Sequence, residues 1–296
     1  MHGWIVLDKP QGITCVKSAN IFKRILGVKK IGHIGTLDPQ ASGVLLLAIG
    51  EATKLIPHID KKTKIYQFDV TFGAETSTLD QEGEITQTTS SIPSQDEILK
   101  VIPQLTGWVD QVPPRYSAIH IDGKRAYDIA RSGQEFDMPT RLVYIGSLNC
   151  VKQKSETCFQ FEVTCGPGTY VRSLARDIAR RLRSLGYVSH LRRIKDGKFN
   201  VQDAVSLEIA KEIGYNCVKS VEYVLDDIPA LHVDEQQAEL IQRGMAVSTH
   251  DSVKINGFEM MHRDNNIALF FNQKLISIAR LEDDLIFPVR NFNLER

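Results

Sequence analysis

Residues 32–50, GHIGTLDPQASGVLLLAIG, hold the most informative arrangement of reactive side chains in the sequence. We predict a glycine-punctuated loop over residues 32–43, because a continuous apolar run of strand length follows at residues 44–49. A buried strand at that point would hold His33 and Asp38 on a rigid support. Asp38 is therefore a candidate nucleophile. The alternative is that the Asp38-Pro39 pair only starts a turn.

Signatures of several other chemistries are absent from the sequence. It contains no GxxxxGK[ST], HExxH or GxSxG string, and its eight histidines are scattered without metal-ligand spacing. Gly166-Pro167-Gly168 begins like a dinucleotide-binding fingerprint, but Val171 occupies the position of the third glycine. We therefore expect no ATP, NAD or zinc chemistry and no metal site.

Hydrophobic periodicity indicates the elements that position these residues. We predict a strand over residues 4–7, a helix capped by Thr14 and closed by Gly27, a half-buried strand over 65–72 that begins near Tyr66, and a strand over 159–163. The capping-box string at residues 94–97 predicts a short helix. A longer helix is expected over 172–185, with leucines and an isoleucine on one side, its arginines on the other, and Gly186 as its end. Strands and helices mix without βαβ alternation, so we expect an α+β fold.

The end of the sequence has a different character. The string DDIP at residues 226–229 reads as a linker, and a helix over 234–243 and a hairpin around Asn272-Gln273 follow it. We predict one domain over residues 1–228 and a second, β-rich domain over residues 229–296.

The formal net charge is zero, with 36 basic and 36 acidic residues, but the charges are unevenly distributed. Residues 9–37 hold six Lys or Arg and no acid, and residues 165–198 hold nine against two acids. Such basic stretches indicate a polyanionic partner, although they could also be solvated helix faces. Five irregularly spaced cysteines, no CxxC pair, no signal-like start and no long apolar run predict a cytoplasmic protein with no membrane segment.

Five strings, in order along the chain, resemble the TruB family of pseudouridine synthases. They are WIVLDKPQGIT, GHIGTLDPQASGVLLLAIGEATK, KIYQFDVTFG, QVPPRYSAIHIDGKRAYDIARSG and CGPGTYVRSLARDIARRL. Cys15 departs from the pattern, because the family usually has Ser there. The resemblance implies a pseudouridine-synthase fold, with a mixed, mainly antiparallel central sheet flanked by helices. It also implies a small C-terminal β-rich, PUA-like module that contacts RNA.

The resemblance implies an isomerase that converts uridine 55 in the T loop of tRNA to pseudouridine without a cofactor. Asp38 would be the nucleophile, attacking either C6 of the base or C1′ of the sugar. A carboxylate is ionised at neutral pH and needs no separate base. Arg172 would be its cationic partner, a role consistent with its otherwise unfavourable place at a helix N-terminus. Tyr66 would stack on the base and could accept a proton from C5 or C2′; the alternative for Tyr66 is core packing.

Further positions are expected to bind the substrate, because the target uridine must flip out of the T loop. His33 would replace the lost stacking, Asp80 would lie near the RNA and the active site, and Tyr170 would form a pocket wall. His120 replaces the family's usual lysine and would be a weaker, pH-dependent cation. The set of expected substrate-binding residues is completed by Lys9, Tyr116 and Leu191.

Two other functions remain open from the sequence alone. An RNA-binding protein without chemistry, such as a folding chaperone for tRNA, would share the basic stretches but would not need Asp38, Tyr66 and Arg172 together. A small-molecule enzyme could hold a phosphate at the 166–168 turn and the following helix. For the tRNA-modifying enzyme we expect the tRNA T-arm as partner, no obligate protein partner, and a monomer.

Overall fold

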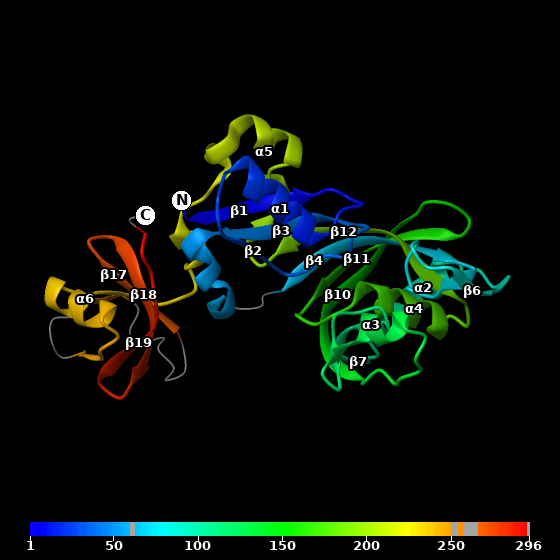
Figure 1. The fold of residues 1–296 in the computed structure, drawn as a ribbon. Helices are drawn as coiled ribbons and strands as arrows, with labels where there is room; N and C mark the ends of the chain where they lie inside the picture. The colour runs from blue at the N-terminus through cyan, green and yellow to red at the C-terminus, as the bar shows by residue number, and fades with distance from the viewer. Residues whose placement is uncertain (60–62, 250–253, 257–265, 295–296) are drawn as a thin grey trace.

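The computed structural model describes residues 1–59, 63–249, 254–256 and 266–294, which form two main β-sheets with helices around them (Figure 1). The strands of the large sheet are β1 (Gly3–Lys9), β2 (Ile31–Ile34), β3 (Ala41–Ile49), β4 (Lys64–Phe72), β7 (Gly107–Gln111), β10 (Arg141–Gln153), β11 (Cys158–Cys165), β12 (Gly186–Asp196) and β13 (Phe199–Asn200). The strands of the C-terminal sheet are β14 (Ala230–His232), β15 (Val247–Ser248), β16 (Lys254–Asn256), β17 (Asn266–Phe271), β18 (Lys274–Glu282) and β19 (Leu285–Asn291). Two small hairpins are β5 (Ala74–Thr76) with β6 (Ile85–Thr88), and β8 (His120–Ile121) with β9 (Lys124–Arg125). The α-helices are α1 (Cys15–Ile25), α2 (Gln95–Val101), α3 (Ala126–Arg131), α4 (Val171–Arg181), α5 (Leu207–Ile213) and α6 (Glu235–Gln242).

The large sheet has the order β1-β3-β12-β4-β11-β10-β7, with β2 paired to β3 and β13 to β12. Neighbouring strands run antiparallel except for β3 and β12, which are parallel. Helix α4 packs against β12 and β4, and α5 packs against β1. The predicted α+β fold, with a mixed and mainly antiparallel sheet, is confirmed.

Local sequence signals account for most of these elements. The Thr14 hydroxyl accepts a hydrogen bond from the Lys17 amide and caps α1, and α2 begins with the expected capping box. Strand β4 alternates as expected, and its face that carries Phe68 packs into a core shared with β11 and α4. Phe68 stacks on Phe161 with ring centroids 5.4 Å apart. The interior of the large sheet therefore follows from alternating apolar residues.

Two predicted boundaries are wrong. The loop predicted over residues 32–43 contains most of β2 and the start of β3. Although β2 contains Gly32, its backbone pairs with residues 46–49 of β3 and so forms a strand. The helix predicted to continue to Leu185 ends at Arg181, and Gly186 begins β12. A Cβ at Gly186 would lie 3.0 Å from the Ala179 Cβ and 3.1 Å from a Val70 methyl. The glycine therefore allows α4 to approach the sheet closely instead of ending the helix.

The predicted arginine face of this helix is also wrong at one position. Arg176 was expected beside Arg180 on the solvent side, but it is only 8% exposed. Its guanidinium donates to the Val112 carbonyl oxygen at 2.9 Å and to the Asp177 carboxylate at 2.9 Å. These acceptors provide buried partners that a helical pattern does not reveal.

The C-terminal sheet is β-rich, as expected, and lies beside the end of the large sheet that carries β1 and β3 (Figure 1). The predicted hairpin is present: Asn272 and Gln273 both have positive φ, at 47° and 63°, as a two-residue type I′ turn between strands requires. Ile278 of β18 is buried in the same apolar cluster as Trp4 of β1. The boundary between residues 228 and 229 stays a prediction, because this cluster joins residues from both sides of it.

In the described part of the chain, no helix is long and apolar enough to cross a membrane.

Candidate active site

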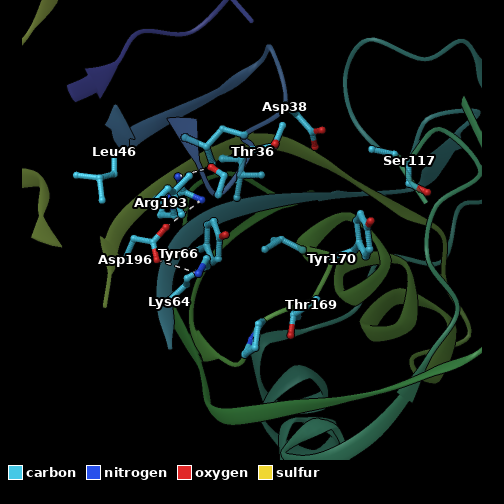
Figure 2. Close-up of a pocket in the computed structure, with 18 of the residues that line it drawn as sticks. Thr36, Asp38, Leu46, Lys64, Tyr66, Ser117, Thr169, Tyr170, Arg193 and Asp196 are labelled. Carbon is cyan, nitrogen blue, oxygen red and sulfur yellow. Dashed lines mark hydrogen bonds and ion pairs between the residues drawn. The ribbon is translucent and has the colours of Figure 1, made fainter. Parts of the chain in front are cut away.

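A cavity of about 770 Å³ opens where the β2–β3 loop, the start of β4, the residues before α4 and the end of β12 meet (Figure 2). Its wall includes most of the residues expected from the sequence, namely Asp38, Tyr66, Asp80, Tyr116, Tyr170, Arg172 and Leu191. These residues come from positions up to 153 apart in the sequence, so only the fold brings them together.

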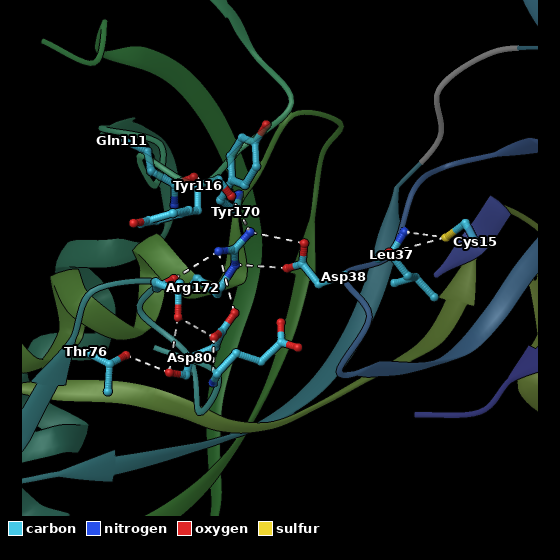
Figure 3. A network of polar contacts seen from close by, with 11 residues as sticks. Cys15, Leu37, Asp38, Thr76, Asp80, Gln111, Tyr116, Tyr170 and Arg172 are labelled. Atoms are coloured by element: carbon cyan, nitrogen blue, oxygen red, sulfur yellow. Dashed lines mark hydrogen bonds and ion pairs between the residues drawn. The ribbon is translucent and has the colours of Figure 1, made fainter. Parts of the chain in front are cut away.

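Asp38 lies in the β2–β3 loop, which is held from both sides. The Leu37 amide donates to the Cys15 Sγ at 3.1 Å, and the Cys15 thiol lies 3.3 Å from the Leu37 carbonyl oxygen (Figure 3). On the other side of Asp38, the Gly12 amide donates to the Pro39 carbonyl oxygen at 2.9 Å. Asp38 itself remains 38% exposed at its side chain. The loop therefore presents its carboxylate to the cavity while its backbone is fixed.

Lys9 holds this loop and does not face the cavity. It is wholly buried, and its Nζ donates to the carbonyl oxygens of Pro10, Ile13 and Pro39 at 2.9, 2.7 and 3.0 Å. Burial lowers the pKa of its ammonium group, although the nearby Cys15 and Asp38 oppose that shift. The expectation that Lys9 contacts the substrate does not fit this position, because all three hydrogen bonds go to backbone.

Arg172 joins the first turn of α4 to the Asp38 loop (Figure 3). Its Nη2 donates to Asp38 Oδ1 at 3.1 Å, and its Nε lies 2.9 Å from Oδ2 in an ion-pair contact without good hydrogen-bond geometry. The same guanidinium donates to the carbonyl oxygens of Thr78 and Tyr116 at 2.9 and 3.1 Å. With its side chain 6% exposed, Arg172 is fixed by several acceptors, which offset the cost of a cation at a helix N-terminus.

Asp80 lies on the other side of Arg172. One of its carboxylate oxygens lies 3.6 Å from Arg172 Nη1. The other accepts hydrogen bonds from the Thr78 hydroxyl at 2.5 Å and the Glu82 amide at 3.0 Å. Asp38, Arg172 and Asp80 thus form a row of alternating charge at the cavity wall.

Tyr66 lies at the start of β4 with its ring against the cavity and its side chain largely buried (Figure 2). Burial raises its pKa to about 12, while the positive charge of Arg193 acts in the opposite direction. Tyr66 is therefore a neutral phenol at neutral pH. Leu191, 9% exposed, also belongs to the cavity wall, so an apolar surface and an aromatic surface are both available to a planar base.

Of the remaining residues expected to bind the substrate, the two tyrosines lie in the described cavity wall and the two histidines do not. Tyr170 and Tyr116 line the cavity, and burial raises the pKa of the Tyr170 phenol. As far as the structure describes it, the cavity wall does not include His33 or His120. His33 lies in β2 with its Nε2 3.4 Å from the Thr36 hydroxyl, and burial lowers its pKa. His120 is exposed in β8.

Sequence reasoning missed a second charged group in the cavity wall, made of Lys64, Arg193 and Asp196. Lys64 precedes Tyr66 by two positions in β4, and Arg193 follows Leu191 by two in β12. Residues two apart share one face of a strand, so this alternation could have revealed both.

The arrangement offers a carboxylate held by a guanidinium beside a cavity with an aromatic wall. Among the described residues, no cluster of His, Cys, Asp and Glu has the arrangement of a metal site. The paired carboxylate is suited to nucleophilic attack on a bound planar molecule.

Comparisons with known proteins identify the family of this chain. The model of the TruB family pseudouridylate synthase (N-terminal domain) matches residues 23–171. The chain is 39% identical to tRNA pseudouridine synthase B of Caulobacter vibrioides over 300 residues, covering 99% of this chain and 97% of that protein. It is 40% identical to the protein of that name from Bradyrhizobium diazoefficiens over 304 residues, covering 99% and 86%.

Solved structures show the same fold. A chain of a Cbf5-Nop10-Gar1 complex superposes with a TM-score of 0.71 at 23% identity, covering 98% of this chain and 84% of that one. A chain of an H/ACA RNP bound to a substrate RNA containing 2′-deoxyuridine gives a TM-score of 0.72 at 19% identity, covering 98% and 85%. From the family model and the relatives' identity over nearly the whole chain, the chain belongs to the TruB family of pseudouridylate synthases.

Proposed function

We propose that this chain isomerises uridine 55 in the T loop of tRNA to pseudouridine, with Asp38 as the nucleophile acting on a flipped-out uridine. The observation that carries the proposal is the contact of Asp38 with the buried guanidinium of Arg172 at the cavity wall. The relatives' common name, tRNA pseudouridine synthase B, supports tRNA as the substrate class.

The reaction breaks the N-glycosidic bond, rotates the detached uracil and rejoins it to the sugar through C5. Asp38 attacks either C6 of the base or C1′ of the sugar, and the geometry is compatible with both. Arg172 holds the carboxylate in one orientation with its charge compensated, so that no reorganisation is needed when the bond forms. The proposed enzyme uses no cofactor.

A detached base must be retained in the cavity while it turns. Tyr66 and Leu191 supply two surfaces for it, and Tyr170 supplies a further wall. Stacking of this kind offsets the few kcal/mol that it costs to take a base out of an RNA stack. His33 is proposed to fill the space left in the RNA, and the exposed His120 to contact it weakly.

The proposal is tested with a T-arm hairpin tritiated at uracil C5. Formation of the new C5 bond releases that tritium to water, so the full chain, with no added cofactor, is expected to release one equivalent per hairpin. A hairpin whose uridine 55 is replaced by cytidine, with its other pyrimidines tritiated at C5, is expected to release none. Failure of the first hairpin to release tritium while it binds the protein would refute the proposed function and favour RNA binding without chemistry.

We further propose that the enzyme acts in the cytoplasm as a monomer without an obligate protein partner. Sedimentation of the chain with and without tRNA tests the oligomeric state. A dimer that persists at nanomolar concentration would contradict it.

A further inference from the structure

The charged group formed by Lys64, Arg193 and Asp196 has no part in the proposed function above. Lys64 Nζ lies 2.8 Å from Asp196 Oδ1, and Arg193 Nη1 lies 3.5 Å from Asp196 Oδ2. The side chains are 15%, 1% and 13% exposed, respectively. Figure 2 shows them beside Tyr66, on the side away from Tyr170. Burying two cations and one anion is costly, so the group needs an explanation beyond packing.

Arg193 binds the backbone on either side of Asp38. Its Nη2 donates to the Gly35 carbonyl oxygen at 2.8 Å, three residues before Asp38, and its Nε donates to the Val44 carbonyl oxygen at 2.7 Å. The third nitrogen, Nη1, is buried and has no hydrogen-bond partner of good geometry among the described residues. Arg193 therefore fixes both ends of the segment that carries the nucleophile, while Nη1, whose contact with Asp196 at 3.5 Å is an ion pair only, can still donate a hydrogen bond.

Gly35 shows how closely the loop packs on this group. A Cβ at Gly35 would lie 2.9 Å from Asp196 Oδ2 and 3.1 Å from Arg193 Nη1, and its φ of +67° also disfavours a side chain. The loop backbone thus rests directly on the Arg193–Asp196 pair. A shift of that pair would be transmitted to the loop.

We propose that Arg193 is a positioning residue that holds the Asp38 loop and, through Nη1, orients the Tyr66 hydroxyl, with the Lys64–Asp196 pair fixing the guanidinium. The group has a net charge of +1 next to Tyr66, whereas Asp38, Arg172 and Asp80 together carry −1. The cationic group beside Tyr66 can therefore stabilise negative charge on the phenol oxygen or on the detached base.

The titration of Tyr66 supports this assignment. Burial raises the pKa of Tyr66, and the positive charge of Arg193 opposes that rise. The geometry agrees, because Arg193 and Tyr66 are directly opposite each other in the antiparallel pairing of β12 with β4, which places the guanidinium and the phenol on the same face of the sheet. Removing the guanidinium would therefore leave the Tyr66 hydroxyl without its cationic neighbour.

The kinetic part of this inference rests on the proposed function, but the contact itself can be tested without activity. The full chain is labelled with tyrosine carrying ¹³C at Cζ, and the Tyr66 signal is assigned with Tyr66→Phe. We compare Arg193→Lys, Asp196→Asn and the control Arg192→Lys. Arg192 is the neighbour of Arg193 on the opposite face of β12, where it pairs with Asp8 at 2.7 Å outside the cavity.

The Tyr66 signal is expected to move in Arg193→Lys and in Asp196→Asn, and to stay in place in Arg192→Lys. Single-turnover tritium release is expected to fall roughly 10- to 100-fold in the first two variants, with affinity for the hairpin nearly unchanged, since a misplaced catalytic group costs rate more than binding. Asp196→Asn changes the side-chain volume little and leaves the Arg193 guanidinium in place, so this variant tests the inference if Arg193→Lys does not fold.

An unmoved Tyr66 signal in the folded variants would overturn the inference, as would rates equal to that of Arg192→Lys. Absence of tritium release from the unmodified chain would instead refute the proposed function. The NMR comparison would still decide whether Arg193 orients Tyr66.

Discussion

Replacing Arg172 by lysine keeps the positive charge but removes the planar fork that reaches four acceptors. Nη1 and Nη2 donate to the carbonyl oxygens of Thr78 and Tyr116, and Nη2 and Nε contact the two oxygens of Asp38. A single, shorter-reaching ammonium can keep only some of these contacts. If two are lost at about 1.5–2 kcal/mol each, as for hydrogen bonds to charged groups, the total is about 3–4 kcal/mol.

Expressed as a rate, that loss is roughly 10²- to 10³-fold, because about 1.4 kcal/mol corresponds to a factor of ten. The assay is single-turnover release of tritium from the T-arm hairpin, at saturating protein. Affinity for the hairpin is expected to change little, because the Arg172 side chain is 6% exposed and offers almost no surface to a phosphate.

Arg176→Lys is the matched control. Arg176 lies one turn further along the same helix and is similarly buried, but its guanidinium binds the Val112 carbonyl oxygen and Asp177 outside the cavity. Its rate is expected to stay within about threefold of the parent's. Equal losses in both variants would refute the reasoning and show that Arg172 acts only through the stability of α4. A folded Arg172→Lys protein within tenfold of the parent would refute it as well.

Three further outcomes follow from the same contacts. Asp38→Asn is expected to abolish tritium release while circular dichroism and hairpin binding stay near the parent's; measurable turnover by the purified variant would contradict its assignment as nucleophile. Cys15→Ser is expected to keep both contacts with the Leu37 backbone. Cys15→Val leaves the Leu37 amide unpaired, so it is expected to lower the free energy of unfolding in urea by about 1–3 kcal/mol and to slow tritium release. Equal stability of the two variants would count against this reasoning. Ile278→Ala is expected to lower the free energy of unfolding by about 2–5 kcal/mol, because Ile278 and Trp4 belong to one apolar cluster. The fluorescence of the buried Trp4 follows the unfolding transition. A loss below about 1 kcal/mol would show that the two sheets are independent.

The sequence predicted the elements best where one local rule acts alone. The capped start of α1, the alternation of β4 and the two-residue turn at Asn272-Gln273 depend on neighbours within a few positions. The end of α4 could not be predicted in this way, because Gly186 responds to the close approach of Ala179 and Val70. The sequence alone does not distinguish a glycine that permits close packing from a glycine that ends a helix.

The charge pattern shows a related limit. The stretch of residues 165–198 suggested a basic surface, but Arg172, Arg176 and Arg193 are buried and bind carbonyl and carboxylate oxygens. They cannot contact phosphates, so fewer phosphate contacts and a shallower salt dependence of RNA affinity are expected than the count of charges implies. The catalytic candidates were found through motifs, whereas Arg193 was hidden among its basic neighbours.

The apolar cluster that unites the two sheets also constrains how the chain is made. Trp4 is buried against residues that the ribosome adds near the end, including Ile278 and Phe292. At 5–20 residues per second, roughly 15–60 s separate the synthesis of Trp4 from that of Phe292. During that interval the part of this cluster that the C-terminal sheet covers has no partner and is open to wrong contacts. We therefore expect nascent chains stalled before β17 to bind chaperones that recognise apolar segments, and to be released once β18 and β19 have emerged.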